Sequence, residues 1–255
     1  GLSEGEKQLS FLSENCSGGS MFKALYADPS GTCQLTVPQR AEVLRQTAAG
    51  MSFLHSENII HRDLKSLNVF LKHPVVSSST TPAIKIGDLG LYDIFFPGER
   101  IPRSRGLGTL QWMAPEVVCS SDYNESCDMW SYGIFMIEVI FGFVPFSPHH
   151  LMEFADQMHM RKQPKEAQPR YLRRVLENLF KRGMVPLRNT VSSPWSQVFQ
   201  DLLCECLEMK PWRRPTFQTI CDRILGAEPK WDPAEEAATT MPARSAVLEK
   251  SFLDE

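Results

Sequence analysis

The first part of the chain changes from a strand pattern to a helical pattern. Residues 8–13 predict a short strand, which the sequence Ser17-Gly-Gly-Ser20 ends. A helix is predicted from Pro38 to His55, because proline fits the first turn of a helix and apolar positions then recur at helical spacing. These positions are Val43, Leu44, Thr47, Ala48, Met51 and Leu54.

Shorter segments follow this helix. Residues 58–71 alternate apolar runs with polar clusters, which predicts strands and loops. A loop is expected over 72–82 and a short strand over 83–86. Residues 92–111 have no period and contain three arginines, so we expect a mobile surface loop there.

The last part of the chain is mainly helical. The apolar stretch Met129–Phe146 contains Glu138 and is shorter than the ~20 residues that a bilayer requires, so it predicts a buried helix and no membrane span. Residues 161–195, rich in proline and charge, interrupt the helical pattern, and we interpret their basic cluster as a solvated helical face, with partner docking as the alternative. A final amphipathic helix is expected near 216–225. The tail 226–255 has few apolar anchors and is expected to be disordered.

Composition narrows the class of protein. Of the 255 residues, 42% are hydrophobic and 22% charged, which suits one sizeable globular core. The net charge of -3 gives no reason to expect a nucleic-acid or acidic-membrane partner. The seven cysteines have no framework spacing, which indicates reduced thiols in the cytosol or the nucleus, and we expect a cytoplasmic location.

The segment from His61 to Asn68 (His-Arg-Asp-Leu-Lys-Ser-Leu-Asn) carries the strongest chemical signal. It resembles the catalytic loop of the protein kinases. The resemblance implies that Asp63 accepts the proton of a substrate hydroxyl, that Lys65 steadies the transferring phosphoryl group and that Asn68 binds Mg²⁺.

Three further segments carry the same resemblance. Asp88-Leu89-Gly90 is similar to the metal-binding Asp-Phe-Gly of kinases, so Asp88 is implied as the second Mg²⁺ ligand; taken alone, this tripeptide is also typical of a simple turn. The segment Gly108–Glu116 resembles the end of a kinase activation segment, and we expect Glu116 to pair with Arg214. Asp128 resembles the aspartate that opens the central helix and accepts hydrogen bonds from the catalytic-loop backbone.

Residues 13–20 resemble the hinge between the two kinase lobes. The resemblance implies that Ser13 is the gatekeeper, that Glu14 and Cys16 offer backbone groups to the adenine of ATP, and that Phe70 forms the floor under the adenine ring. A Gly/Ser loop without this role is the alternative for the segment taken alone.

The branch of the family follows from details of these motifs. Asp-Leu-Lys, with Thr109 in Gly-Thr-Leu, is similar to Ser/Thr kinases of the tyrosine-kinase-like group, which includes Raf and the mixed-lineage kinases. His61 is expected to pack beside residue 89, and Thr109 to position the catalytic loop. Arg62 implies control by a phosphate on the activation segment, placed by an upstream kinase, with Ser104 as the candidate and a solvated serine as its alternative.

The resemblance predicts an α+β, protein-kinase-like fold with a mainly helical C-lobe, short β hairpins and a truncated N-lobe. Residues 1–13 would be the remnant of the N-lobe, 14–19 the hinge and 20–225 the C-lobe. The Gly-rich loop, strand lysine and helix glutamate of the family are absent from the sequence, and the strand at 8–13 is expected to be an unpaired edge. Two functions stay open: an ATP- and Mg²⁺-dependent kinase acting on Ser/Thr of a protein substrate, or, because these three elements are absent, a catalytically inactive kinase-like fragment or scaffold.

Overall fold

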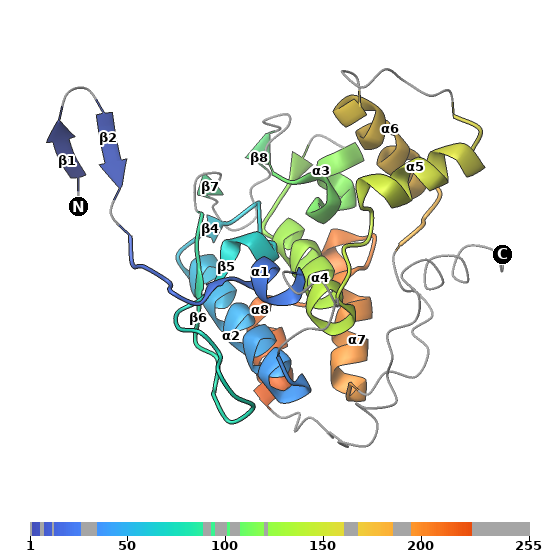
Figure 1. The fold of residues 1–255 in the computed structure, drawn as a ribbon. Helices are drawn as coiled ribbons and strands as arrows, with labels where there is room; N and C mark the ends of the chain where they lie inside the picture. The colour runs from blue at the N-terminus through green and yellow to red at the C-terminus, as the bar shows by residue number, and fades with distance from the viewer. Residues whose placement is uncertain are drawn as a thin grey trace.

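The computed structural model describes residues 2–5, 8–11, 13–26, 35–88, 93–94, 101–102, 108–119, 122–160, 168–185 and 195–225. Figure 1 shows a mainly helical body with short strands along one side. Its α-helices are α1 (Met21–Tyr26), α2 (Val37–Ser56), α3 (Pro115–Cys119), α4 (Ser126–Phe141), α5 (Pro148–Gln157), α6 (Gln168–Lys181), α7 (Gln197–Cys206) and α8 (Phe217–Leu225). Three 3₁₀ turns are η1 (Ser66–Asn68), η3 (Leu110–Trp112) and η5 (Pro211–Arg213).

The strands form small antiparallel sheets. They are β1 (Leu2–Gly5), β2 (Gln8–Phe11), β3 (Gly19–Ser20), β4 (Ile59–Ile60), β5 (Val69–Leu71), β6 (Ile84–Ile86), β7 (Asp93–Ile94), β8 (Ile101–Pro102) and β9 (Asp122–Tyr123). β3, β5 and β6 form a three-stranded sheet in that order, while β1 pairs with β2, β4 with β7 and β8 with β9. The predicted α+β class is therefore confirmed.

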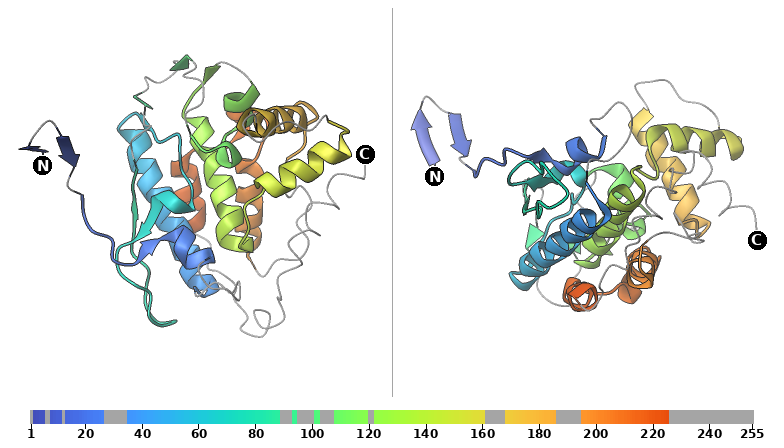
Figure 2. Two further views of the ribbon diagram at one scale, coloured as in Figure 1. Left: turned by 45° about the horizontal axis from the view of Figure 1, so that its top comes forward. Right: turned by 60° about the horizontal axis from the view of Figure 1, so that its bottom comes forward.

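Helix α4 is the centre of the body. Every residue from Ser126 to Ile140 is buried, and α4 contacts both α2 and α7. Figure 2 shows it between these helices in two further views. The buried tyrosine Tyr132 donates a hydrogen bond to the carbonyl of Leu44 in α2 (3.0 Å), which satisfies its hydroxyl inside the core. Because α4 is surrounded on all sides, whatever it holds in place is fixed to the core.

Helix α2 begins with a capping box. Thr36 accepts from the backbone N–H of Gln39, and the Gln39 side chain accepts from the N–H of Thr36. The Gln39 amide nitrogen also donates to the carbonyls of Ser77 (2.8 Å), Ser78 (3.3 Å) and Thr80 (2.8 Å). The start of α2 thus anchors the loop that joins β5 to β6. The predicted helix from Pro38 to His55 is confirmed within one residue at each end.

Three sequence predictions need correction. β2 is not an unpaired strand, because β1 pairs with it in register from Leu2–Phe11 to Gly5–Gln8; the hairpin stands apart from the helical body in Figure 1. The buried helix ends at Phe141 and not at Phe146, because Gly142 takes the left-handed conformation (φ 69°) and stops it. The charged stretch 161–195 also contains a helix, α6, whose apolar face is buried.

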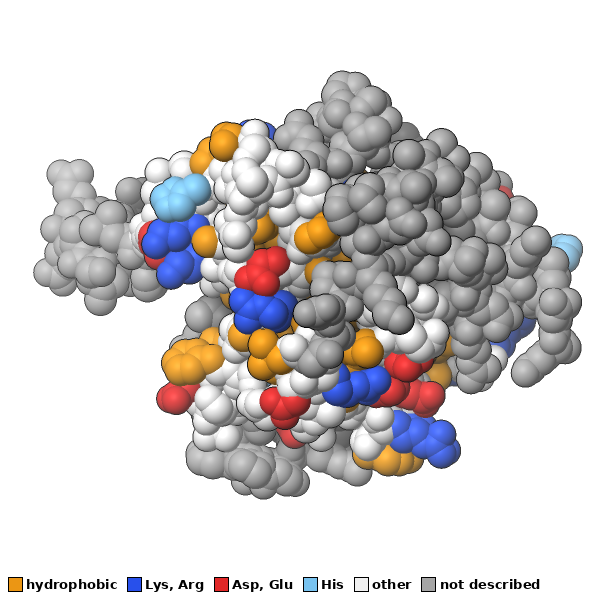
Figure 3. All heavy atoms as spheres, turned by 90° about the horizontal axis from the view of Figure 1, so that it is seen from below, with side chains coloured by type: hydrophobic (Ala, Val, Ile, Leu, Met, Phe, Trp, Pro, Cys, Tyr) orange, Lys and Arg blue, Asp and Glu red, His pale blue; other side chains and the backbone are white. Residues whose placement is uncertain are grey.

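None of the helices in the described part of the chain has the length and apolarity that crossing a membrane requires. The face seen from below carries basic, acidic and hydrophobic side chains interspersed with one another (Figure 3).

On α6, Arg173 does not lie free on a solvated face: it donates to the carbonyls of Val117 (2.9 Å) and Val118 (3.0 Å) at the end of α3.

Candidate active site

The candidate catalytic segment, residues 61–68, is attached to the N-terminal turn of α4. The buried carboxylate of Asp128 accepts the backbone N–H of His61 (2.8 Å) and of Arg62 (2.9 Å), and it bonds the His55 ring at 2.9 Å. Burial works to raise the pKa of Asp128, but the His55 hydrogen bond, the charges of His55 and His61 and the Arg62 N–H lower it below its usual value. Asp128 therefore stays ionised and fixes the backbone just before Asp63, as the sequence predicted.

The backbone at Arg62 is held in an unfavourable conformation. Arg62 has φ 69°, a left-handed value that costs a non-glycine residue about 1–2 kcal/mol. Its N–H bond to Asp128 helps to offset this cost. The turn that results presents the next residue, Asp63, toward the segment that begins at Gly108.

The carboxylate of Asp63 is the point on which four donors converge. Its Oδ1 accepts the N–H of Thr109 (2.9 Å) and the Thr109 hydroxyl (2.7 Å). Its Oδ2 accepts Lys65 Nζ (2.5 Å) and Asn68 Nδ2 (3.1 Å), and Lys65 also donates to Thr109 Oγ1 at 2.6 Å. The structure thus brings together three residues that the sequence singled out around a fourth. A carboxylate offers about four lone-pair sites, so all of them are occupied here.

Asn68 and Asp88 carry oxygen atoms close to two paired strands: Asn68 directly precedes β5, and Asp88 comes two residues after the end of β6. Asn68 uses its Nδ2 to bond the Asp63 carbonyl (2.8 Å) and carboxylate, which leaves its Oδ1 as the atom suited to a cation. The N–H of Gly87 donates to the Asn68 carbonyl (2.9 Å), which brings the backbone just before Asp88 next to Asn68. Asp88 is exposed and has φ 59°, and His61 Nε2 lies 3.1 Å from the Gly87 carbonyl.

The oxygen atoms of Asn68 and Asp88 would suit Mg²⁺, which takes few protein ligands, better than a metal ion whose ligands all come from the protein. Among the described residues, no three His, Cys, Asp or Glu side chains gather into a metal cluster. Mg²⁺ commonly takes one or two protein carboxylates and completes its coordination with phosphate and water. Asn68 Oδ1 and the Asp88 carboxylate would provide such a small set of protein ligands.

The linker at 13–18 leads into β3, at the edge of the sheet whose middle strand, β5, follows Asn68. β3 pairs with β5, and the N–H of Gly18 donates to the Leu71 carbonyl (3.1 Å). A Cβ at Gly18 would stand 2.5 Å from the His73 carbonyl oxygen, so only glycine permits this approach. Glu14 forms ion pairs with Lys72 and Lys85, both at 3.1 Å, and these lysines lower the pKa of its carboxyl. The Cys16 carbonyl, implied as a group for adenine, already accepts the Gly19 N–H (3.0 Å).

Phe70 is half-buried on the middle strand of this sheet. Its ring approaches Gly87 so closely that a Cβ there would be 2.9 Å from Phe70 Cε2. The ring thus packs against the backbone just before Asp88. That position suits the predicted floor under a flat ring, a role that stays a prediction.

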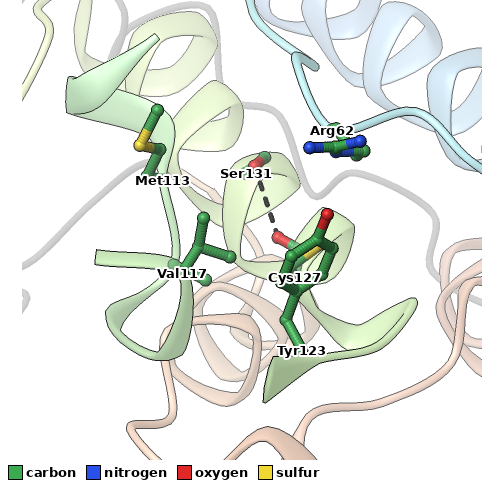
Figure 4. A pocket seen from close by; sticks show the side chains of 7 residues that line it. Arg62, Met113, Val117, Tyr123, Cys127 and Ser131 are labelled. Atoms are coloured by element: carbon green, nitrogen blue, oxygen red, sulfur yellow. Dashed lines mark hydrogen bonds between the residues drawn. The ribbon is translucent and has the colours of Figure 1, made fainter. Parts of the chain in front are cut away.

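A small cavity lies beside the catalytic segment and apart from Asp63. Figure 4 shows its lining by Arg62, Met113, Val117, Tyr123, Cys127 and Ser131; Ala114 completes it. The Arg62 guanidinium lies over the Tyr123 ring, 5.4 Å from its centroid. Burial raises the pKa of the Cys127 thiol well above its usual range, so this cysteine lines the cavity as an unreactive thiol.

An ion pair ties the segment after Thr109 to the core. Arg214 Nη1 and Nη2 donate to Glu116 Oε1 (2.6 Å) and Oε2 (2.8 Å), and Nη1 also donates to the Ser126 carbonyl. The Arg214 side chain is fully buried. The sequence predicted this pair between residues far apart in the chain, and the structure contains it.

Sequence reasoning missed the part played by Glu138. This buried carboxylate accepts the Ser66 hydroxyl (2.5 Å) and N–H (3.3 Å), Trp112 Nε1 (2.7 Å) and the Tyr26 hydroxyl (3.4 Å). Burial raises the pKa of Glu138 to about 7, against the lowering effect of these hydrogen bonds. The available signal was a single acid inside an otherwise apolar helix, because a buried charge requires partners.

Some predictions fall outside the described residues. Ser104, the candidate for regulatory phosphorylation, is one of them, as are Leu89 and Gly90 and most of 92–107. The tail 226–255 is another. Nothing in the structure bears on these predictions.

The chain is similar in sequence to known protein kinases. The profile described as "Protein kinase domain" matches residues 1–224. A probable serine/threonine-protein kinase of Dictyostelium discoideum is 31% identical over 88% of this chain and 32% of its own length. The serine/threonine-protein kinase CLA4 of Saccharomyces cerevisiae is 38% identical over 55% of this chain and 16% of its own. Human serine/threonine-protein kinase A-Raf is 29% identical over 85% of this chain and 31% of its own. The chain therefore spans about a third or less of the length of these relatives.

Proposed function

Since the chain belongs to the protein kinase family and is of its Ser/Thr, Raf-like type, we propose that it transfers the γ-phosphoryl group of ATP to a Ser or Thr hydroxyl of a protein, with Asp63 as the base. The predicted kinase-like fold is confirmed by the same match. The observation that carries the proposal is the convergence of Lys65, Asn68 and Thr109 on the Asp63 carboxylate.

The occupancy of Asp63 suggests how a substrate hydroxyl would reach it. Because four donors fill its lone-pair sites, the hydroxyl can bond Asp63 only when one donor leaves. Thr109 and Asn68 are held on short side chains, whereas Lys65 has a flexible stem. Release of Lys65 toward the transferring phosphoryl group would free Oδ2 for the hydroxyl proton, so one movement serves both roles.

The other residues would bind and orient. Asn68 Oδ1 and the Asp88 carboxylate would hold Mg²⁺, which neutralises phosphate charge when bound. The linker around Glu14 and Cys16 would present backbone groups to adenine, above the ring of Phe70. Arg62 would receive a phosphate on Ser104 as a regulatory contact. The six cysteines described are free, which supports a reducing compartment such as the cytoplasm as part of the same proposal.

The variant Asp63→Asn tests the proposal because it keeps the size of the side chain and removes the base. We expect phosphoryl transfer from MgATP to a Ser/Thr protein substrate to fall by about 10²–10⁴-fold, the usual contribution of a general base. Asp201→Asn, on the exposed face of α7, is the matched control and should keep the rate of the unaltered chain. If the unaltered chain shows no transfer above the Asp63→Asn background, the alternative of a non-catalytic scaffold replaces this proposal.

A further inference from the structure

Helix α6 carries a row of basic side chains on its exposed face. Figures 1 and 2 show α6 at the edge of the body, beside α3 and α5, and it contacts both. Because a helix turns about 100° per residue, Arg170, Arg174 and Lys181 lie within a sector of about 40°, and all three are exposed. We call these three residues the α6 basic stripe. The opposite side of the helix is apolar and buried, through Tyr171, Leu172, Val175, Leu176, Leu179 and Phe180.

The stripe has no counter-charge in the described part of the chain. Residues 168–182 contain five Lys or Arg and one Glu, although the whole chain has a net charge of -3. The single acid, Glu177, pairs with Arg173 at 3.5 Å, and no other described carboxylate pairs with a residue of the stripe. Arg170 and Arg174 are also one turn apart, a placement of like charges that destabilises a helix slightly. Folding alone does not favour this pattern, whereas a bound anion would neutralise it.

The backbone that carries the stripe is fixed to the body. Arg173 donates to the carbonyls of Val117 (2.9 Å) and Val118 (3.0 Å) at the end of α3. On the buried side, the Phe180 ring packs edge-to-face on the Trp130 ring of α4, with 5.4 Å between centroids. Since both contacts hold the rotation of α6, the stripe faces solvent before a partner arrives, which lowers the ordering cost of binding.

The length of the stripe sets the length of its partner. Lys181 follows Arg170 by eleven residues, so the stripe is about 16 Å long at the helical rise of 1.5 Å per residue. An extended peptide rises about 3.3 Å per residue, so about six residues cover this length. Arginine binds carboxylates through two parallel hydrogen bonds. A short run of Asp and Glu therefore matches the stripe in both length and charge.

Two other anionic partners fit the stripe less well. A helix that lies on a lipid surface inserts its apolar face, but the apolar face of α6 is buried against the body. None of the large hydrophobic side chains exposed among the described residues lies on α6. Nucleic acid is a long polyanion, which would also meet the net negative charge of the chain beyond the stripe. A short acidic peptide can contact the stripe alone.

We propose that the α6 basic stripe is a docking site for an acidic segment of another protein, a run of about six residues rich in Asp and Glu. The proposal does not depend on the proposed function, because this binding uses no residue of the candidate active site. It replaces the interpretation of the basic cluster as a solvated helical face.

Peptide binding to the full chain tests this proposal. Fluorescence anisotropy would give the Kd of a labelled peptide with about six consecutive glutamates and of a matched peptide in which glutamine replaces each glutamate. We expect the acidic peptide to bind roughly tenfold more tightly at low salt, and the difference to shrink as added salt screens the charges. Arg174→Glu should weaken binding of the acidic peptide roughly tenfold, because it replaces an attraction by a repulsion, while Arg174→Lys should keep most of the affinity.

The matched control is Arg213→Glu, which makes the same change of charge at an exposed arginine of η5 and should leave the Kd unchanged. Equal affinity for the two peptides, absence of binding, or equal weakening by Arg174→Glu and Arg213→Glu would each overturn the proposal. Tighter binding of a short DNA duplex or of phosphatidylserine vesicles, lost in Arg174→Glu, would assign the stripe to a different partner and overturn it too. The same holds for a dimer, seen by sedimentation velocity, that Arg174→Glu dissociates.

Discussion

The catalytic segment and the linker flank the same candidate site, but the structure holds them in different ways. Residues 61–68 are bonded to two fully buried carboxylates of α4, Asp128 and Glu138. The linker is held by backbone contacts at Gly18 and by the Glu14 side chain, which is 46% exposed and shared between two surface lysines. The side that would do chemistry is therefore part of the core, whereas the side that would receive adenine is attached at the surface.

Solvent explains why this difference matters energetically. A buried charge that loses its partner cannot turn to water, so breaking a buried pair from one side costs far more than the pair's net contribution. An exposed pair is screened by water and salt, and its loss leaves both groups solvated. Changes around 61–68 and 116 should thus unfold the body, and changes at the linker should not.

The largest effect is expected for Glu116→Gln, which leaves the fully buried Arg214 without its counter-charge. We expect the free energy of unfolding, measured in urea, to fall by about 3–5 kcal/mol. The matched control is Glu42→Gln in the partly exposed Glu42–Arg45 pair (2.6 Å) on the surface of α2, for which we expect at most about 1 kcal/mol. If the two variants lost the same free energy of unfolding, burial of the Glu116–Arg214 pair would not explain its contribution.

An intermediate effect is expected for Glu138→Gln, and it depends on pH. Because the pKa of Glu138 is raised from 4.5 to about 7, the folded chain keeps a proton there that the unfolded chain releases. This group therefore lowers stability as pH rises from about 4.5 to 7, by up to about 1.4 kcal/mol per pH unit, while below 4.5 it contributes no pH dependence.

Urea unfolding of the unaltered chain and of Glu138→Gln at pH 5, 6, 7 and 8 would show this. The difference in free energy between the two should shift with pH up to about 7 in favour of the variant, and then level off. A pH-independent difference would mean that Glu138 has an ordinary pKa and that its four donors outweigh its burial.

The smallest effect is expected for Glu14→Gln in the linker. The Glu14 carboxylate is exposed, so the unfolding midpoint should stay within measurement error. Losing the two ion pairs should instead loosen the linker, which amide hydrogen exchange at residues 14–18 would detect as faster exchange, most clearly at low salt. A large drop in the midpoint would show that the linker, too, is built into the core.

The sequence predicted the parts of the site whose spacing is local. Asp63, Lys65 and Asn68 lie within one short segment, and the structure brings the three side chains together as hydrogen-bond partners. The Glu116–Arg214 pair was also predicted, because both residues sit in recognisable motifs. The roles in catalysis, nucleotide binding and regulation remain predictions.

The rest escaped prediction because it depends on packing between distant segments. Glu138 gathers Tyr26, Ser66 and Trp112, which share no pattern in the sequence. The partner of β2 was missed because residues 2–5 have no alternating apolar pattern, yet their backbone pairs with β2. Helix α6 was hidden by its charge, although its buried face has a helical period.

The attachment of the catalytic segment to α4 also sets an order of events during synthesis. His61 precedes Asp128 by 67 residues, and Ser66 precedes Glu138 by 72. At roughly 5–20 residues per second, the ribosome adds Asp128 about 3–13 s after His61. Until then the amide groups of residues 61 and 62 have no carboxylate to bind, and the left-handed turn at 62 has nothing to hold it. The nascent chain therefore holds residues 61 and 62 in their final conformation only after the first turn of α4 has been synthesised.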